Sequence, residues 1–260
     1  MQKFTYHCHT DFSDGRNTLE EMLTQAVKIG FDSIGISDHL IINDLIPTNR
    51  TFAQALPVLQ NRIAEIRKTA QNYPLKVLVG FEVDYMPYPG WLDNFKKLKS
   101  QLDVDYLHTG NHYFMDTDCS KFISIYRSKE IFSDKTRLPE YFRRHFQTIC
   151  QAVYSCQFDF LAHIDYARWS GLMKDGEYKA EIMNIVHALS ETGTAVELNT
   201  KGLDSTGSFY PSAWILKELK AHKVPLVISD DAHHVSQLGR YFDKAEELLS
   251  ELNYTYRFSL

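Results

Sequence analysis

The chain has 260 residues, of which 44% are hydrophobic, and this is enough to bury a sizeable core. Its formal net charge of -5 and pI near 6.1 argue against a nucleic-acid surface, which needs clustered Lys and Arg, and favour a small-molecule partner. No stretch approaches the roughly 18 apolar residues that a membrane span requires.

The remaining global features concern compartment and domain count. The four cysteines, at positions 8, 119, 150 and 156, form no C-x-x-C pair, and the N-terminus lacks a basic segment followed by an apolar core. We therefore expect a cytoplasmic protein with reduced thiols. Because no linker, low-complexity run or strong repeat divides the chain, we expect a single domain over residues 1–260. The oligomeric state is not readable from the sequence.

The first element is a short strand near the N-terminus. Residues 4–9 alternate apolar Phe4, Tyr6 and Cys8 with polar residues, which is the period of a strand. His7 and His9 then point to the same side, so both imidazoles can reach one cation. The turn that follows adds two carboxylates.

Strand and helix patterns alternate along the rest of the chain. A capping box at Thr18 and Glu21 begins a helix that stops at Gly30. Six further strands are predicted, at residues 31–39, 75–85, 104–114, 158–165, 194–200 and 224–233. Six further helices are predicted, at residues 53–72, 91–102, 139–156, 177–193, 212–223 and 238–252. Strict alternation implies parallel strands. We expect a distorted (β/α)7 barrel, with a doubly wound open sheet as the alternative.

Each predicted strand ends in polar side chains. In chain order these are His7 and His9; Asp38 and His39; Glu82 and Asp84; Asn111 and His112; His163 and Asp165; Glu197 and Asn199; and Asp230, Asp231 and His233. In a parallel barrel these ends meet on the face that carries active sites. A single such residue is more often bonded to a loop backbone, but this explanation is much weaker for all seven ends together.

The other histidines receive different interpretations. His145, His187 and His222 fall in predicted helices, where a surface or packing role is expected. His108 lies inside its strand and is assigned to packing, and His234 should project away from its neighbour His233.

Imidazole and carboxylate donors without thiolate suit Zn²⁺, Mn²⁺ or Fe²⁺ in an open hydrolytic site. The donors are too many for one ion, and a carboxylate such as Glu82 can bridge two. Two metals about 3.5 to 4 Å apart form a known arrangement for in-line phosphoryl displacement.

Seven segments together resemble the polymerase and histidinol phosphatase (PHP) family. They are HCHTDFSDG, SDH, GFEVDY, NHYF, AHID, ELNT and SDDAH, in this order and at these separations. The resemblance covers nearly the whole chain and is closest to the stand-alone histidinol-phosphate phosphatases. It implies a distorted (β/α)7 barrel with three divalent metal ions, Zn²⁺ being favoured over Mn²⁺ or Fe²⁺. It also implies hydrolysis of L-histidinol phosphate in histidine biosynthesis.

The resemblance also implies a ligand set. It assigns one metal to His7, His9, Glu82 and Asp231, a second to Glu82, His112 and His163, and a third to Asp14, His39 and His233. Two alternatives stay open, because Asp11 could replace Asp14 and Asp230 could replace Asp231.

The expected mechanism is attack on phosphorus by metal-activated hydroxide, since no Gly-x-Ser-x-Gly elbow supplies a serine nucleophile. Arg168 is the first candidate to bind the phosphoryl group, followed by Arg16 and Lys201. Asp165 or His233 is the candidate general acid. Asn199 and Asn111 are candidate substrate contacts. The substrate's amine and imidazole call for a carboxylate and an aromatic wall, which we expect from the loops at 40–52 and 113–137.

Three other functions compete. The nearest is another PHP phosphoesterase, acting on a nucleotide or on phosphotyrosine. A second is an amidohydrolase-type C–N hydrolase, many of which bridge two metals with a modified lysine. Here Glu82 holds the bridging position and Lys76 lies at the wrong end of its strand. A third is a non-catalytic metal-binding domain, which should have lost ligands, yet none of the nine ligand positions is apolar.

Overall fold

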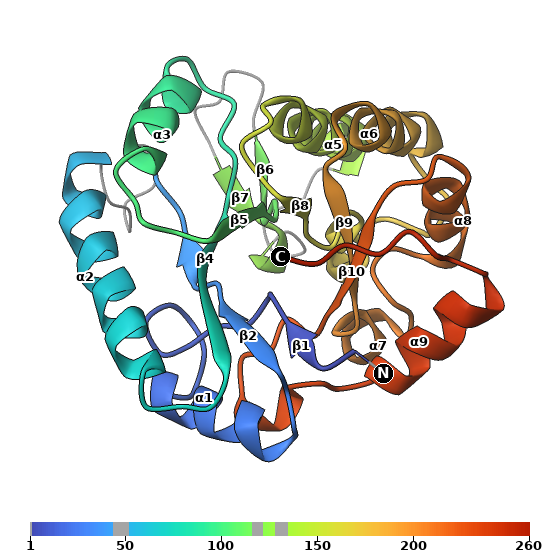
Figure 1. Ribbon diagram of the computed structural model, residues 1–260. Helices are drawn as coiled ribbons and strands as arrows, with labels where there is room; N and C mark the ends of the chain where they lie inside the picture. The colour runs from blue at the N-terminus through green and yellow to red at the C-terminus, as the bar shows by residue number, and fades with distance from the viewer. Residues whose placement is uncertain (1, 44–51, 116–121, 128–134) are drawn as a thin grey trace.

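Parallel strands form the centre of the computed structural model, which describes residues 2–43, 52–115, 122–127 and 135–260. The order in the sheet is β1 (Phe4–Thr5), β2 (Ser33–Ile36), β4 (Lys76–Val83), β5 (Tyr106–Thr109), β8 (Phe160–Leu161), β9 (Ala195–Asn199) and β10 (Leu226–Ser229). A parallel bridge joins Cys8, just after β1, to Ala232, just after β10. The sheet is thus nearly closed into a barrel (Figure 1), and the predicted distorted (β/α)7 architecture is confirmed.

Helices surround this barrel (Figure 1). They are α1 (Leu19–Lys28), α2 (Phe52–Ala70), α3 (Trp91–Lys99), α5 (Leu138–Tyr154), α6 (Lys179–Thr192), α7 (Gly202–Thr206), α8 (Ala213–Ala221) and α9 (Phe242–Glu251). The predicted capping box begins α1, because Thr18 Oγ1 accepts from the Glu21 backbone N–H while Glu21 Oε2 accepts from that of Thr18. Among the described residues, none of these helices combines the length and apolar character needed to cross a bilayer.

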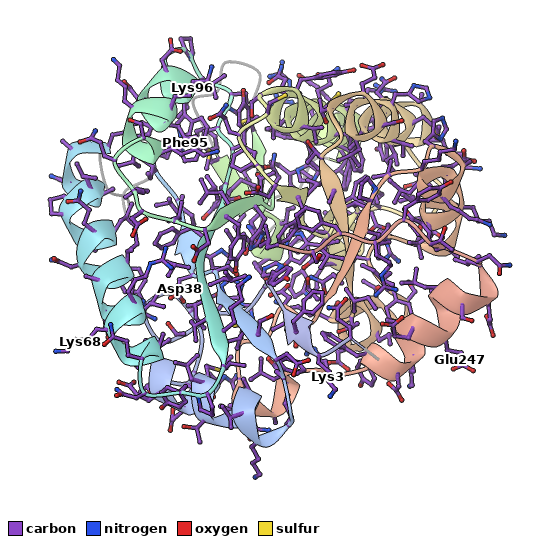
Figure 2. All side chains as sticks on the ribbon, viewed as in Figure 1. Lys3, Asp38, Lys68, Phe95, Lys96 and Glu247 are labelled. Atoms are coloured by element: carbon purple, nitrogen blue, oxygen red, sulfur yellow. The ribbon has the colours of Figure 1, made fainter. Side chains whose placement is uncertain are left out.

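The helices bury one face against the strands and expose the other. In α1 the buried residues are Leu19, Met22, Leu23 and Ala26, the spacing of an amphipathic helix. Lys68, Lys96 and Glu247 project outward from their helices, whereas Asp38 lies in the interior (Figure 2).

Aromatic side chains fill the end of the barrel at which the strands begin. The Tyr106 ring occupies the space left by Gly35 and Gly80, where any Cβ would overlap it, and its hydroxyl donates to Tyr6 O at 2.7 Å. The C-terminal segment packs Phe258 against this cluster and bonds to Leu226. With this end filled by side chains, the opposite end is left for a site.

Several predicted boundaries were wrong. The strand predicted over 104–114 ends at Thr109, so His112 lies on the following loop. Residues beyond it form a separate antiparallel pair, β6 (Tyr113–Met115) with β7 (Phe122–Ser124). A further short strand, β3 (His39–Leu40), pairs with β4. The loop before β6 turns because His112 bonds through its backbone N–H to the Asp84 carboxylate, which ends regular pairing there.

Candidate metal centre

The C-terminal ends of the parallel strands bring all nine predicted metal ligands into one cluster. Four overlapping groups have one donor atom per residue within 4.8 Å of one another: His9, Asp14, His39 and His233; His7, His9 and Glu82; His7, His163 and Asp231; and His39, Glu82 and His112. The groups share members, so the cluster is continuous. We call these nine residues the ligand cluster.

Glu82 lies at the centre of the ligand cluster. It sits near the end of β4, fully buried, with five imidazoles around its carboxylate. Oε2 lies 3.2 Å from His7 Nε2, 3.5 Å from His9 Nε2 and 3.1 Å from His39 Nδ1, and Oε1 lies 3.0 Å from His163 Nε2 and 3.6 Å from His112 Nε2. The two oxygens therefore face two different sets of nitrogens, as a bridging carboxylate requires.

Asp231 and Asp14 supply carboxylates at the edge of the cluster. Asp231 Oδ1 lies 3.5 Å from His9 Nε2 and 3.7 Å from His7 Nε2. Asp14 Oδ2 lies 3.4 Å from His39 Nε2 and 3.3 Å from His233 Nε2. Asp231 Oδ1 also lies 3.3 Å from His233 Nδ1, so both carboxylates connect the histidines around Glu82 to His233.

The sequence left open Asp11 and Asp230 as alternative ligands. Both lie in positions different from those of Asp14 and Asp231. Asp11 is exposed, and its backbone N–H bonds to Asn17. The Asp230 carboxylate accepts from Thr5 Oγ1 at 3.0 Å and from the Gly239 backbone at 2.6 Å. Both lie outside the groups formed by the described residues, so the geometry favours Asp14 and Asp231.

The donor set fits divalent cations. Within the described part of the chain, six buried atoms of the ligand cluster lack a hydrogen-bond partner: His7 Nε2, both ring nitrogens of His9, His39 Nδ1, Glu82 Oε2 and His163 Nδ1. Donors of a tetrahedral ion with bonds of about 2.1 Å lie roughly 3.4 Å apart, close to the separations around Glu82 Oε2. Buried carboxylates are normally paired or bound to metal. With the imidazoles in the neutral form that binds a metal, the three carboxylates would leave a negative site that cations balance.

The charges in the cluster are strongly coupled. Burial opposes ionisation of Glu82, but His7, His112 and His39 outweigh it and hold its pKa well below the usual range. Burial likewise opposes protonation of His7, yet the Glu197, Glu82 and Asp231 carboxylates raise its pKa. For His9, burial and the His233 and His39 rings together lower the pKa, which favours the neutral imidazole, the form that can bind a metal.

Carboxylates behind the cluster orient its imidazoles. Glu197 Oε1 accepts from His7 Nδ1 at 2.6 Å, and Oε2 accepts from the His163 backbone and from Asn199 Nδ2, both at 2.9 Å. Asp84 lies 3.2 Å from His112 Nδ1. Such partners fix the ring orientation and raise the basicity of a ligating histidine. The sequence placed both carboxylates at strand ends but assigned them no role.

Strained backbone presents two of the predicted ligands. His163 and Asp231 have φ of 22° and 49°, a region that non-glycine residues seldom adopt. The Arg240 guanidinium holds the second turn by donating to Asp230 O at 2.6 Å and Asp231 O at 3.3 Å. The sequence analysis missed Arg240, because it lies on a loop nine residues beyond its partner.

A glycine makes room for the cluster. A Cβ on Gly110 would overlap Glu82 Oε1 and would lie 2.6 Å from His163 Cε1. Gly110 is therefore required by close approach, a constraint that the sequence alone did not reveal.

The predicted phosphate-binding side chains lie in different surroundings. Lys201 faces the cluster, with Nζ 3.1 Å from Asp231 Oδ1. Arg168 is nearly buried, and its Nε, NH1 and NH2 contact Asp165, Ser208 Oγ and Phe209 O at 2.7, 2.7 and 2.6 Å. Arg16 is exposed and meets the site through its backbone N–H on His233 O. Of the three, Lys201 is the cation placed directly at the ligand cluster.

The candidate substrate contacts and the candidate general acid Asp165 also differ in whether they lie at the ligand cluster. Asn199 bonds to Glu197, lies 3.3 Å from Asp231 Oδ2 and accepts from the Lys201 backbone. Asn111 is buried and faces a small cavity with Asp84 and Thr148. Asp165 accepts from the Ser212 backbone and pairs with Arg168, outside the groups found among the described residues.

The histidines that were predicted to have packing or surface roles lie in surroundings that match those roles or come close to them. His145 is buried between α5 and the β6 region, whereas His187 is exposed. His108 stacks on Phe160 at 4.6 Å inside the barrel and contacts the His7 ring at 4.3 Å. His234 points to Ser236 rather than to the cluster.

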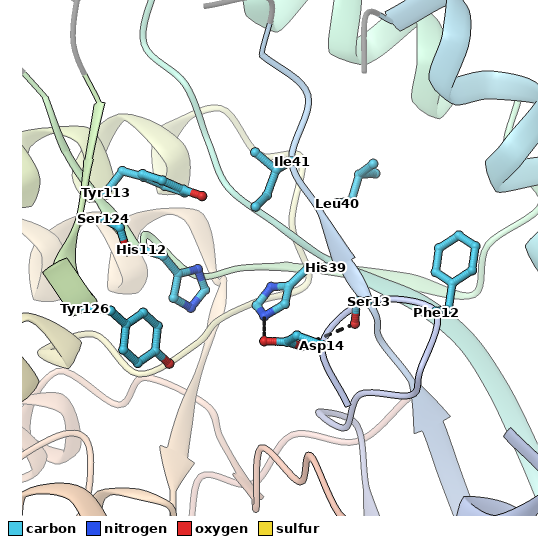
Figure 3. A pocket seen from close by; sticks show the side chains of 10 residues that line it. All are labelled: Phe12, Ser13, Asp14, His39, Leu40, Ile41, His112, Tyr113, Ser124 and Tyr126. Atoms are coloured by element: carbon cyan, nitrogen blue, oxygen red, sulfur yellow. Dashed lines mark hydrogen bonds and ion pairs between the residues drawn. The ribbon is translucent and has the colours of Figure 1, made fainter. Parts of the chain in front are cut away.

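A cavity of about 380 Å³ opens beside the ligand cluster (Figure 3). Its lining is Phe12, Ser13, Asp14, His39, Leu40, Ile41, His112, Tyr113, Ser124 and Tyr126. Residues 40, 41, 113, 124 and 126 belong to the two loops predicted to contact substrate, and the other parts of those loops at 44–51, 116–121 and 128–134 lie outside the described residues. The cavity combines an aromatic wall with a carboxylate at its mouth.

Comparisons with known proteins agree on one family. The PHP domain model matches residues 5–201. A histidinol-phosphatase of Bacillus subtilis is 27% identical over 94% of this chain and 98% of its own length. The structure of histidinol phosphate phosphatase from Lactococcus lactis, complexed with zinc, L-histidinol and phosphate, has a TM-score of 0.76. It is 21% identical, and the match covers 98% of this chain and 95% of that one.

Proposed function

The chain belongs to the PHP domain family, and from this premise we propose that it hydrolyses L-histidinol phosphate to L-histidinol and phosphate. Support comes from the near full-length similarity to the Bacillus subtilis histidinol-phosphatase and from the ligands of the Lactococcus lactis enzyme, which has the same fold. The reaction belongs to histidine biosynthesis, and we place it in the cytoplasm.

One observation carries the proposal. A bridging carboxylate, Glu82, is surrounded by imidazoles at the end of the barrel where active sites occur, directly beside a cavity large enough for a small phosphate ester.

We assign the metals to three positions. Following the family resemblance, His7, His9, Glu82 and Asp231 would hold the first ion, Glu82, His112 and His163 the second, and Asp14, His39 and His233 the third, and within each set a carboxylate oxygen lies 3.0 to 3.7 Å from the imidazole nitrogens. Zn²⁺ is favoured over Mn²⁺ or Fe²⁺ for this nitrogen and oxygen set. Divalent ions bound there supply Lewis acidity toward phosphoryl oxygens and lower the pKa of water to near neutrality.

The protein's own groups bind and orient the ester. The Lys201 ammonium, beside Asp231, donates to a phosphoryl oxygen, and Asn199 holds the Lys201 backbone in place. Arg168 braces the 208–212 loop in the present arrangement, so Lys201 replaces it as the first candidate phosphate contact. Arg16 lies in the turn after Asp14 and remains a secondary candidate to bind the phosphoryl group. Asn111 lies behind Asp84 and remains a secondary candidate for a substrate contact.

The leaving group occupies the cavity. Tyr113 and Tyr126 offer an aromatic wall to the imidazole of histidinol, and Asp14 offers a carboxylate near the amine. The Tyr126 hydroxyl is protonated at neutral pH and can donate a hydrogen bond. Asp165 and His233 stay the candidate general acids, of which only His233 lies in the ligand cluster.

The amidohydrolase alternative is disfavoured by position. Glu82 lies where a bridging group is needed, whereas Lys76 is exposed at the start of β4, at the opposite end of the same strand. The competing PHP phosphoesterase activities differ in leaving group rather than in the metal centre.

A substrate panel tests the proposal. Turnover of histidinol phosphate should exceed that of p-nitrophenyl phosphate, nucleoside monophosphates and phosphotyrosine, and a chelator should abolish it. A strong preference for a nucleotide would reject the substrate assignment, and unchanged turnover after metal removal would reject the metal-dependent mechanism.

A further inference from the structure

A buried ion pair lies beneath the turn that carries Asp14. Asp38 follows β2, Arg62 lies in α2, and Arg62 NH2 is 3.1 Å from Asp38 Oδ2. Their side chains are only 1% and 3% exposed. A buried pair costs desolvation of both ions, and breaking it leaves an unpaired charge inside the protein. The pair is therefore strongly held, and its other contacts decide what it positions.

The Asp38 carboxylate organises the turn at residues 10–14. Oδ1 accepts from the Thr10 backbone N–H at 2.7 Å and from Ser13 Oγ at 2.9 Å, and Oδ2 lies 2.8 Å from Thr10 Oγ1. Both ends of the turn are thus tied to one side chain. Because the charge of Asp38 is balanced by Arg62, these hydrogen bonds depend on the pair.

Arg62 contacts the same turn from α2. Its NH2 donates to Thr10 Oγ1 at 2.6 Å, and its guanidinium lies 4.9 Å from the Phe12 ring centroid, a cation–π distance. NH1 pairs with Glu65 on the outer side. The helix is thereby linked through one arginine to the turn.

Ser13 connects this network to Asp14. Ser13 Oγ, bonded to Asp38, also lies 3.4 Å from Asp14 Oδ1, and Asp14 in turn pairs with His39 (Figure 3). The Asp14 side chain is 54% exposed, so packing does not fix it. Asp38 also immediately precedes His39 in the chain. Two members of the third metal position therefore take their placement from Asp38.

We propose that Arg62 and Asp38 are positioning residues that set the metal affinity of the third position, formed by Asp14, His39 and His233. This inference rests on the proposed metal cluster. Groups that orient metal ligands from behind typically contribute 10–100-fold to metal affinity. The effect should be selective, because His7, His163 and His112 are held by Glu197 and Asp84 instead.

The test is a Zn²⁺ titration of the full-length protein after removal of metal. Bound zinc per chain is measured at a series of free Zn²⁺ concentrations for the wild type and for Arg62→Met, which removes the charge but keeps much of the side-chain length. Arg67→Met is the matched control, because Arg67 lies on the same helix and pairs with Asp105 at the surface. Arg62→Lys tests rescue by charge alone.

We expect one of three zinc-binding steps to weaken 10–100-fold in Arg62→Met, with the other two steps unchanged and Arg67→Met equal to the wild type. Arg62→Lys should recover part of the loss. Excess Zn²⁺ should restore occupancy, which it would not do if the variant were merely misfolded.

Ser13→Ala keeps the proposal testable if Arg62→Met does not fold. This variant removes only the hydroxyl between Asp38 and Asp14, and it should weaken the same step without changing the melting temperature. The proposal would be overturned if folded Arg62→Met and Ser13→Ala gave the same titration curve as the wild type. It would also be overturned if the saturated wild type bound fewer than three zinc ions. Turnover of histidinol phosphate by the wild type is measured separately, so the proposed function can fail or stand independently.

Discussion

His7 Nδ1 lies 2.6 Å from Glu197 Oε1, and both side chains are completely buried. This contact leaves Nε2 of the same ring directed at Glu82 and Asp231. The carboxylate thus decides which nitrogen of His7 faces the ligand cluster. It does so on the side away from the cavity, where it cannot touch substrate.

Replacing Glu197 by Gln should weaken metal binding 10–100-fold with little change in volume. A neutral amide cannot accept at both ends, so either the His163 backbone and Asn199 or the His7 ring loses its acceptor. Zinc content after dialysis at fixed free Zn²⁺ measures the effect. Glu191→Gln, which alters a surface contact to Tyr154, is the control. Equal zinc content in the two variants would contradict the role assigned to Glu197.

Gly110→Ala should inactivate the enzyme by displacing Glu82, the carboxylate proposed to bridge two metals. The added methyl group would overlap Glu82 Oε1 and press on His163. Because both atoms belong to buried, tightly held side chains, we expect turnover to fall at least 100-fold with reduced zinc content. Steady-state kinetics and metal analysis of folded protein, verified by thermal unfolding, test this. An active variant with full metal content would show that the cluster can accommodate the added methyl group, and would contradict the prediction.

The positions of the ligands could be predicted from sequence because a parallel barrel collects its strand ends on one face. His7 lies on an alternating segment, and Glu82 and Asp231 lie at the ends of apolar runs, all of which predicted strands, so the convergence of the three followed from the parallel topology. The supporting groups could not be predicted in the same way. Arg62 looks like a solvated helix residue, and its burial depends on how α2 meets the turn after β1.

His112 shows a second limit of the sequence pattern. The segment from 104 to 114 was predicted as one strand, but pairing stops at Thr109, and beyond it the His112 backbone N–H bonds to Asp84. The ligand was therefore identified correctly as a cluster member while its local structure was wrong. Tertiary hydrogen bonds of this kind leave no periodic signal.

His145 should make stability depend on pH. Its ring is buried beside Phe114 and Phe146, with Nδ1 3.3 Å from Tyr113 O, and burial lowers its pKa to about 4. In the unfolded chain the value is about 6.5. Between these values the unfolded state binds the proton and the native state does not. Stability is therefore complete above about pH 6.5 and is lost as the pH falls toward 4, by up to roughly 3 kcal/mol.

The variant His145→Gln isolates this contribution. Gln can still donate to Tyr113 O but does not titrate, so the decrease in melting temperature between pH 7 and pH 4.5 should be smaller than in the wild type. His187→Gln, at an exposed site on α6, should retain the full decrease. If the melting temperature of all three proteins fell by the same amount between pH 7 and pH 4.5, His145 would not be the group responsible.

Lys201→Met should weaken phosphate recognition while leaving the metals in place. Lys201 Nζ is held 3.1 Å from Asp231 Oδ1, where burial is outweighed by that carboxylate and its pKa is raised, so the side chain stays charged. A hydrogen bond to a charged group contributes about 1.5 to 3 kcal/mol, which corresponds to roughly 10–150-fold. We expect the inhibition constant of inorganic phosphate to rise by that factor, with zinc content unchanged. Lys217→Met, on the exposed face of α8, should behave as the wild type. If phosphate inhibition were unaffected in Lys201→Met and lost in Arg168→Met, the phosphoryl contact would belong to Arg168, which would have to release Ser208 to make it.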